Sequence, residues 1–217
     1  MGSSAIEARR QAALEEGNVG YLARRQEIIK AAKNVFRERG FEATLRDVAE
    51  VIGTDRASLY YYVGSKDELL QEIVREALAR DIAAATAVQK SKASTPDKIR
   101  ALIVSMVHSY SDNYPHMNVN TEDLRRIAHD ESDWAIEVIA QTREYEAIVM
   151  SILNKGRTDK SLRKDLPVNV SALALFGMIN WMHRWYRPSY PTPPEEIART
   201  FAEIFLSGYA TTEAAAG

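Results

Sequence analysis

Apolar residues recur at helical spacing through most of this chain, and the clearest case lies just after residue 44. Four residues there share one face at the i, i+3, i+4 and i+7 spacing of a helix that packs on a core: Leu45, Val48, Ala49 and Ile52. Thr44 is placed to cap this helix, Gly53 to end it in the left-handed conformation, and Asp55 to cap the next one. The pattern predicts two short helices that meet at a glycine turn.

The same spacing predicts helices through the rest of the chain. Lys66 begins one that fades near Gln89, and a second begins at a Thr95 cap with Pro96 in its first turn. The others are expected at 121–129, at 132–155 with a stop at Gly156, at 167–186, and after a Thr192 cap. Because no sustained period-2 run competes with these patterns, we predict an all-α fold of about nine helices.

Composition limits the class of protein. The chain has 217 residues, 46% of them hydrophobic, which is enough for one or two domains with a real core. It has no cysteine, which excludes disulfides, thiolate metal sites and cysteine nucleophiles. No apolar run reaches membrane-spanning length, and residues 1–18 lack the apolar centre of a signal peptide. We therefore expect a cytoplasmic protein with no membrane association.

The charge is distributed unevenly. The formal net charge is −2, yet residues 24–66 carry nine basic residues against six acidic ones. Arg9 and Arg10 would add to this excess if the N-terminal segment were an arm along the minor groove of DNA, where arginine is favoured. The alternative is a solvated tail.

A short helix held outward by a glycine turn is the geometry with which proteins enter the major groove of DNA. Arg56 is the best candidate for a base contact, since arginine commonly pairs with guanine, and a phosphate contact is the alternative. Tyr60 and Tyr61 offer hydroxyls to phosphate and ring faces to thymine methyl groups, whereas Tyr62 is expected in the core.

Catalytic and metal-binding patterns are missing. His108, His116, His129 and His183 are scattered and form no His-x-x-x-His pair, and no serine lies in a strand-to-helix elbow. The run from His129 to Glu131 points its side chains in different directions, so we expect no metal, no cofactor and no enzyme activity.

Several motifs resemble the signature of the tetracycline-repressor (TetR) family over about residues 22–72. They are Phe36, Gly40-Phe41, Ala49, Gly53, Ser58-Leu59-Tyr60-Tyr61 and Ser65-Lys66-Asp67-Glu68-Leu69-Leu70. The chain departs from the family in a shorter Glu42-Ala43-Thr44 loop and in Thr54, where an apolar residue is usual. The resemblance implies phosphate contacts from Thr44, Arg46, Tyr60 and Lys66, and a position nearer the bases for Tyr61.

The resemblance also implies a domain plan. We expect an N-terminal arm at 1–21, a three-helix helix-turn-helix domain at 22–68, a helical effector-binding and dimerisation domain at 69–210, and a tail at 211–217. The full set of expected DNA-binding residues is Thr44, Arg46, Thr54, Asp55, Arg56, Ala57, Ser58, Tyr60, Tyr61 and Lys66.

In the family, the last two helices of each subunit form the dimer interface as a four-helix bundle. The corresponding residues here are Ala172, Gly177, Phe201, Phe205 and Tyr209, with ordinary core packing as the alternative. Two heads on a two-fold axis would also supply the specificity that one small head lacks.

The effector pocket is expected among aromatic and methionine residues of the C-terminal domain, because methionine suits an adaptable pocket. The candidates are Met106, Tyr110, Met117, Met150, Phe176, Met178, Trp181, Met182 and Trp185, and core packing is again the alternative. The Trp-Tyr-Arg-Pro run that ends at Pro188 is similar to family members that respond to acyl-CoA thioesters, with Arg125, Arg126, Arg184 and Arg187 as candidate phosphate ligands.

The sequence therefore predicts a dimeric transcriptional regulator, a repressor that binds a palindromic operator and is released by a small hydrophobic effector such as an acyl-CoA thioester. The alternative is an all-α protein-protein interaction adaptor without sequence-specific DNA binding. The identity of the effector, the operator sequence and the regulated genes are not encoded in these patterns.

Overall fold

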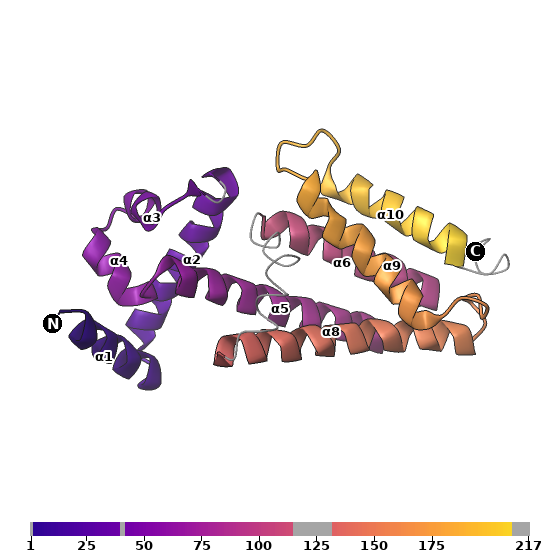
Figure 1. Ribbon diagram of the computed structural model, residues 1–217, viewed down its shortest axis with the longest axis horizontal. Coiled ribbons are helices and arrows are strands. Elements are labelled where there is room, and N and C mark those ends of the chain that lie inside the picture. Colours follow the sequence, from indigo (N-terminus) through magenta and orange to yellow (C-terminus); the bar gives the residue numbers. More distant parts are fainter. Residues whose placement is uncertain (1, 40–41, 115–131, 210–217) are drawn as a thin grey trace. The chain divides into compact units, whose positions relative to one another are not determined.

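The structure is a computed structural model that describes residues 2–39, 42–114 and 132–209. All of the elements in these ranges are helices, which confirms the all-α fold. The described chain divides into two compact units, the first built on helices up to Val74 and the second on helices from Arg75 onward. One helix, α5 (Lys66–Lys90), contributes residues to both units (Figure 1).

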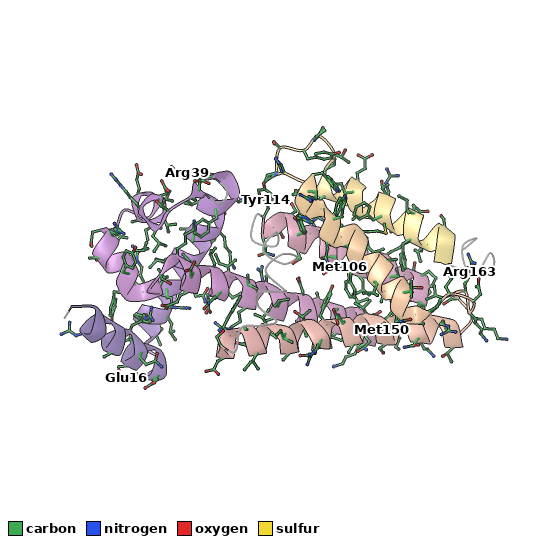
Figure 2. All side chains as sticks on the ribbon, viewed as in Figure 1. Glu16, Arg39, Met106, Tyr114, Met150 and Arg163 are labelled. Atoms are coloured by element: carbon green, nitrogen blue, oxygen red, sulfur yellow. The ribbon has the colours of Figure 1, made fainter. Side chains whose placement is uncertain are left out.

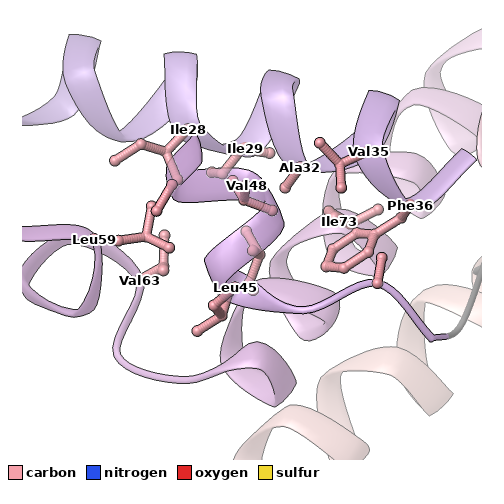
Figure 3. Packing of buried hydrophobic residues seen from close by; sticks show 13 residues of the cluster. Ile28, Ile29, Ala32, Val35, Phe36, Leu45, Val48, Leu59, Val63 and Ile73 are labelled. Atoms are coloured by element: carbon pink, nitrogen blue, oxygen red, sulfur yellow. The ribbon is translucent and has the colours of Figure 1, made fainter. Parts of the chain in front are cut away.

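The first unit joins α1 (Gly2–Glu15), α2 (Val19–Arg39), α3 (Leu45–Val51) and α4 (Arg56–Val63) to the start of α5. Helices as short as α3 and α4 are unstable alone, so packing holds them in place. Figure 3 shows the shared core, which consists of Ile28, Ile29, Ala32, Val35, Phe36, Ala43, Leu45, Val48, Ala49, Leu59, Val63, Leu69 and Ile73.

Local signals set the ends of α3 and α4 as predicted. Thr44 caps α3 in a capping box: its hydroxyl accepts from the Asp47 backbone N–H, and the Asp47 carboxylate accepts from the Thr44 N–H at 2.7 Å. Gly53 has a φ of 64°, a conformation that costs glycine little. The Asp55 carboxylate then caps α4 by accepting from the Ser58 N–H at 2.8 Å.

The N-terminal residues form a helix, α1, where the sequence left an arm along the minor groove and a solvated tail as alternatives. In α1, Arg10 pairs with Glu68 of α5 at 2.6 Å, and its side chain is mostly buried. Gly64 lies directly beneath it with a φ of 64°, and a Cβ at that position would overlap the Arg10 guanidinium. The charge of Arg10 is therefore used inside the first unit.

The second unit contains the later part of α5, α6 (Thr95–Asp112), α8 (Asp133–Thr158), α9 (Val168–Asn180) and α10 (Pro194–Tyr209). A short 3-10 helix, Trp181–Arg184, follows α9 directly. α10 packs along α6, and α8 contacts both α6 and α9. The fully buried side chains of this unit include Ile99, Leu102, Ile103, Leu153, Leu162 and Leu175.

The helix ends predicted at Thr95 and Gly156 were wrong. Ser94, not Thr95, caps α6, because its hydroxyl accepts from the Asp97 N–H while the Thr95 hydroxyl donates to Asp159 at 2.9 Å. α8 continues through Gly156 to Thr158. A Cβ at Gly156 would lie 2.5 Å from Leu162 Cδ1, so this glycine provides close packing and does not end the helix.

The remaining elements differ in smaller ways. α10 begins at Pro194, and its first backbone bonds run to the carbonyl of Pro193, so Thr192 is one residue outside the capping position. The helix expected at 167–186 divides into α9 and the 3-10 turn. The helix expected at 121–129 lies outside the described residues.

Candidate nucleic-acid interface and ligand cavity

Three helix starts meet at a hollow of about 390 Å³ in the first unit, which we call the basic hollow. Its lining comes from the beginnings of α3 and α5 and from α4, and it consists of Thr44, Leu45, Arg46, Arg56, Tyr60 and Lys66. Three cations and two hydroxyls thus converge on one concave surface. Such a surface is complementary to a phosphate backbone.

Two of these side chains are already organised by each other. The Arg56 guanidinium donates to the Tyr60 hydroxyl at 3.0 Å, and its carbon lies 5.2 Å from the centre of the Tyr60 ring. A guanidinium has five N–H donors, so this bond leaves several for a ligand. Holding the side chain in one place lowers the entropy lost when it binds.

Lys66 is anchored to the core of the first unit. Its ammonium lies 5.7 Å from the centre of the buried Phe36 ring, a cation–π distance. Lys66 is the first residue of α5 and is half-buried. The packing of Phe36 therefore positions a cation at the wall of the basic hollow.

Three tyrosines, Tyr21 of α2 and Tyr61 and Tyr62 of α4, form a second cluster in this unit. The Tyr21 hydroxyl donates to the carbonyls of Tyr61 and Tyr62 at 3.3 Å each, and its ring lies 5.1 Å from Tyr62 and 5.4 Å from Tyr61. Burial raises the pKa of Tyr21, so its hydroxyl keeps the proton that it donates. The cluster fixes the carboxyl half of α4 against α2.

The second unit contains a cavity of about 210 Å³, which we call the apolar cavity. Its walls come from α5, α6, α8 and α9, and they consist of Leu78, Asp81, Met106, Ser109, Tyr110, Thr142, Tyr145, Glu146, Leu173, Phe176, Ile179 and Asn180. Such a mixture of apolar walls and a few polar groups is typical of small-molecule sites.

Polar groups from three helices meet at one wall of this cavity. The Ser109 hydroxyl of α6 donates to the Asp81 carboxylate of α5 at 2.8 Å. Burial raises the pKa of Asp81 to about 6. Burial, together with the nearby Asp81 charge, also raises the pKa of Tyr145 on α8. Asp81 is thus a partly buried carboxylate whose charge depends on pH near neutrality.

Apolar residues are also exposed on α9 and α10 of the second unit, and one of them, Leu173, also lines the apolar cavity. On α9, Val170 and Leu173 are more than half exposed, and Gly177 follows at the same helical face with no heavy atom within 4 Å of a Cβ built on it. On α10, Ile204 is 62% exposed. Because contiguous exposed apolar surface marks interaction sites, these residues are candidates for one.

Family models match both units. Residues 28–73 match the model described as bacterial regulatory proteins, tetR family, and residues 92–209 match the tetracyclin repressor-like C-terminal domain. The chain belongs to the TetR family. It is therefore a helix-turn-helix transcriptional regulator, as the motif resemblance predicted.

Relatives of this TetR-family chain extend over nearly its whole length. The HTH-type transcriptional repressor KstR2 of Mycolicibacterium smegmatis is 24% identical over 188 residues, which cover 86% of this chain and 90% of that protein. The ketosteroid transcriptional regulator KstR2 of Mycobacterium tuberculosis superposes with a TM-score of 0.74 at 23% identity, over 87% and 95% of the two chains. AibR in complex with isovaleryl coenzyme A and operator DNA superposes with a TM-score of 0.64 at 17% identity, over 83% and 97%.

These relatives agree with the expectation of a regulator that is not an enzyme. Within the described ranges, no group of three metal-ligating side chains is assembled. No helix in those ranges combines the length and the apolar character needed to cross a membrane.

The ten residues expected to bind DNA separate into groups. Thr44, Arg46, Arg56, Tyr60 and Lys66 line the basic hollow of this TetR-family chain. Asp55 and Ser58 bond each other in the α4 cap, which lowers the pKa of Asp55. Tyr61 packs in the tyrosine cluster, Ala57 is exposed and Thr54 is half-buried.

Tyr21 was not singled out from the sequence, although it lies seven residues before Ile28 on the buried face of α2.

Three of the nine residues expected in the pocket line the apolar cavity: Met106, Tyr110 and Phe176. Figure 2 places Met106 on α6 and Met150 on α8, and neither Met150 nor Met178 belongs to the cavity lining. Met117 lies outside the described residues, as do Arg125 and Arg126.

The aromatic residues after α9 have other surroundings. Trp181 is 59% exposed beneath the Arg184 guanidinium, and Met182 is fully buried in the core. Trp185 packs against Tyr186, Tyr190 and Phe201. The pattern predicted one pocket wall from these residues, but in the 3-10 helix and after it their side chains point in different directions.

Asp81, Ser109 and Tyr145 were not expected in the cavity. Asp81 lies four residues after Ala77 and four before Ala85, both of which are buried, so it continues the inward face of α5. A carboxylate on an inward helical face was the signal that could have found it.

The five residues expected at the dimer interface differ in accessibility. Ala172 and Phe205 are buried inside the second unit, because those faces of α9 and α10 pack on its core. Phe201 is half-buried against Trp185, and Gly177 is exposed. The Tyr209 side chain lies outside the described part of the structure.

Proposed function

We propose that this protein is a homodimeric repressor that binds a palindromic operator and releases it when a small apolar effector enters the apolar cavity. The observation that carries the DNA-binding part is the basic hollow, where Arg46, Arg56 and Lys66 converge from three helix starts. The effector part rests on the apolar cavity and on the family membership.

On DNA, Arg56 would approach a guanine edge from the start of α4. Thr44, Arg46, Tyr60 and Lys66 would hold phosphates on either side, which position the protein without selecting a sequence. The Arg56–Tyr60 bond holds the guanidinium in one place, one turn further along α4. Arg10 takes no part, since it is paired with Glu68.

A second copy of the chain would pack on the exposed apolar residues of α9 and α10. Val170 and Ile204 are residues that such an interface would bury, with Gly177 allowing close approach. Ala172 and Phe205 would support this surface from beneath it. In an isologous contact of this kind, a two-fold axis would relate the recognition helices of the two subunits.

The effector would be a compact apolar group. The cavity volume of about 210 Å³ is below the range of about 300–1,000 Å³ that is usual for drug-sized ligands. AibR was solved with isovaleryl coenzyme A, which carries a short acyl group on a large polar carrier. By analogy, the acyl end of a CoA thioester would occupy the cavity here, with the carrier outside it.

Signal transfer would use α5. Leu69 and Ile73 belong to the core of the first unit, while Leu78 and Asp81 of the same helix line the cavity. A ligand that prefers one position of this helix would shift the population of DNA-binding conformers.

The test is selection of duplexes from a randomised pool by the full chain, followed by anisotropy titration at about 150 mM salt. We expect a palindromic sequence bound at least about 1,000-fold more tightly than scrambled duplex. Arg56→Ala should reduce this ratio, whereas Arg46→Ala should weaken both duplexes alike. Equal binding of selected and scrambled duplexes would overturn the proposal and favour an adaptor.

A further inference from the structure

The apolar cavity carries negative charge and no basic side chain in its described lining. Asp81 on α5 and Glu146 on α8 are both wall residues, and no lysine, arginine or histidine is among the others. Around Asp81, α5 adds the exposed Arg80, α8 adds Tyr145 and Glu146, and the lining residues of α6 and α9 add no charged side chain. A ligand inside the cavity therefore meets carboxylates without a counter-ion on the wall.

The hydrogen bond between Ser109 and Asp81 at this wall has a defined direction. The Ser109 hydroxyl has one proton, and it donates that proton to Asp81 Oδ2 at 2.8 Å. An ionised carboxylate only accepts, and its two oxygens offer about four lone-pair positions, of which Ser109 fills one. The Asp81–Ser109 pair consequently presents acceptors toward a ligand.

We propose that Asp81 makes the cavity selective for an apolar ligand whose polar group is a hydrogen-bond donor, a hydroxyl or an ammonium, and that it excludes free carboxylates. This inference rests on the proposed function, which places the effector in the apolar cavity. A carboxylate ligand would face Asp81 as a like charge in a partly desolvated site, where repulsion is stronger than in water. A donor would instead fill an open lone pair of Asp81.

The proposal narrows the effector class. A free short-chain acid would be rejected, whereas the neutral acyl group of a thioester is tolerated and a hydroxylated acyl group is preferred. An apolar amine satisfies the same requirement through charge as well as hydrogen bonding. Hydroxyl and ammonium ligands differ in how strongly their affinity depends on the charge of Asp81.

The experiment uses three probes with one carbon skeleton: cyclohexylmethylamine, cyclohexylmethanol and cyclohexanecarboxylate. Each is titrated calorimetrically into the full chain at pH 7.5. We expect the amine and the alcohol to bind at least about tenfold more tightly than the carboxylate. Asp81→Asn should reduce the difference between amine and carboxylate to below about threefold, and it should weaken the amine more than the alcohol.

Glu146→Gln is the matched control, because it removes the other carboxylate of the same cavity. We expect it to keep the preference of the wild-type chain, because Glu146 is exposed and solvent screens its charge, whereas Asp81 is partly buried. The selectivity inference is overturned if the wild type binds all three probes equally, if Asp81→Asn leaves the preference unchanged, or if Glu146→Gln abolishes it. Thermal melting of each variant shows that it is folded.

Failure of the underlying function has a different signature. Thr142→Phe places a ring in the cavity and should weaken every probe to a similar extent. If the wild type binds none of the probes, or if Thr142→Phe changes no affinity, the apolar cavity is not the effector site, and both the effector part of the proposed function and the selectivity inference fail. If Thr142→Phe blocks binding but the probes are not distinguished, only the selectivity inference fails.

Discussion

Gly156 and Leu162 pack so closely that α8 has room for no side chain at residue 156. A Cβ there would lie 2.5 Å from Leu162 Cδ1 and 2.7 Å from Thr95 Cγ2. Leu162 is fully buried and Thr95 is nearly so. The contact ties the end of α8 to the beginning of α6.

Gly156→Ala should therefore destabilise the protein, although alanine is the better helix former. Overpacking a closed site costs about 1–3 kcal/mol, which exceeds the gain of about 1 kcal/mol from helix propensity. Thermal and urea unfolding of the variant measure this loss. Gly208→Ala is the control, since no heavy atom lies within 4 Å of its Cβ position, and it should not lower stability. Equal effects of the two substitutions would contradict the packing argument.

Lys66→Gln should change how DNA binding depends on salt. One phosphate contact contributes about 0.9 to the slope of log affinity against log salt, so the slope should decrease by about that amount. Anisotropy titrations between about 50 and 200 mM salt measure it. Lys92→Gln, in the exposed turn after α5, should leave the slope unchanged. An unaltered slope in Lys66→Gln would remove this residue from the proposed interface.

The stability of the protein should depend on pH through Asp81. Burial raises its pKa from the ordinary value to about 6, so the folded state holds the proton more tightly than the unfolded state. Stability from this group is therefore greatest when Asp81 is protonated, and it is lost as pH rises from about 4 to 6.

Asp81→Asn should accordingly be more stable than the parent at pH 8, by on the order of 1–3 kcal/mol, with a smaller difference at pH 5. Urea unfolding at the two pH values makes the comparison. Because the Ser109 hydroxyl lowers the pKa of Asp81, Ser109→Ala should raise that pKa further and enlarge the total change of stability with pH. A difference of the same size at both pH values would show that Asp81 does not titrate in this range.

Ile204→Glu should dissociate the proposed homodimer, because it places a charge on an apolar surface that the partner would cover. Sedimentation velocity measures the mass of the particle in solution. Ile136→Glu is the matched control: Ile136 is exposed to a similar extent, 58% against 62%, but lies on α8. If the control dissociates the dimer and Ile204→Glu does not, the interface has been assigned to the wrong helices.

The prediction of where α3 and α4 begin and end was confirmed because the signals that set these ends are local. The Thr44 and Asp55 caps and the positive φ of Gly53 each depend on residues within three or four positions along the chain. The side chains that face outward from such a unit follow from the same helical spacing. Tyr21 was missed because its partners, the carbonyls of Tyr61 and Tyr62, lie 40 and 41 residues away.

The cavity depended on contacts that no local pattern specifies. Met106, Tyr110 and Phe176 line the cavity, and Met182, which the same pattern selected, fills the core instead. Asp81 and Ser109 are 28 residues apart and meet only where α5 approaches α6. Neither residue type indicates a ligand site until the other is beside it.

The sequence by itself determined most of the helices, the turn at Gly53 and the family, because caps, glycine conformations and helical periodicity act over a few residues. Only the tertiary structure decided which of many inward side chains surround empty space and which fill the core. It also placed Asp81 on a cavity wall and Ala172 and Phe205 inside the second unit. The physical reason is that burial and close packing depend on helices distant in the chain, whose rotation and spacing no single segment encodes.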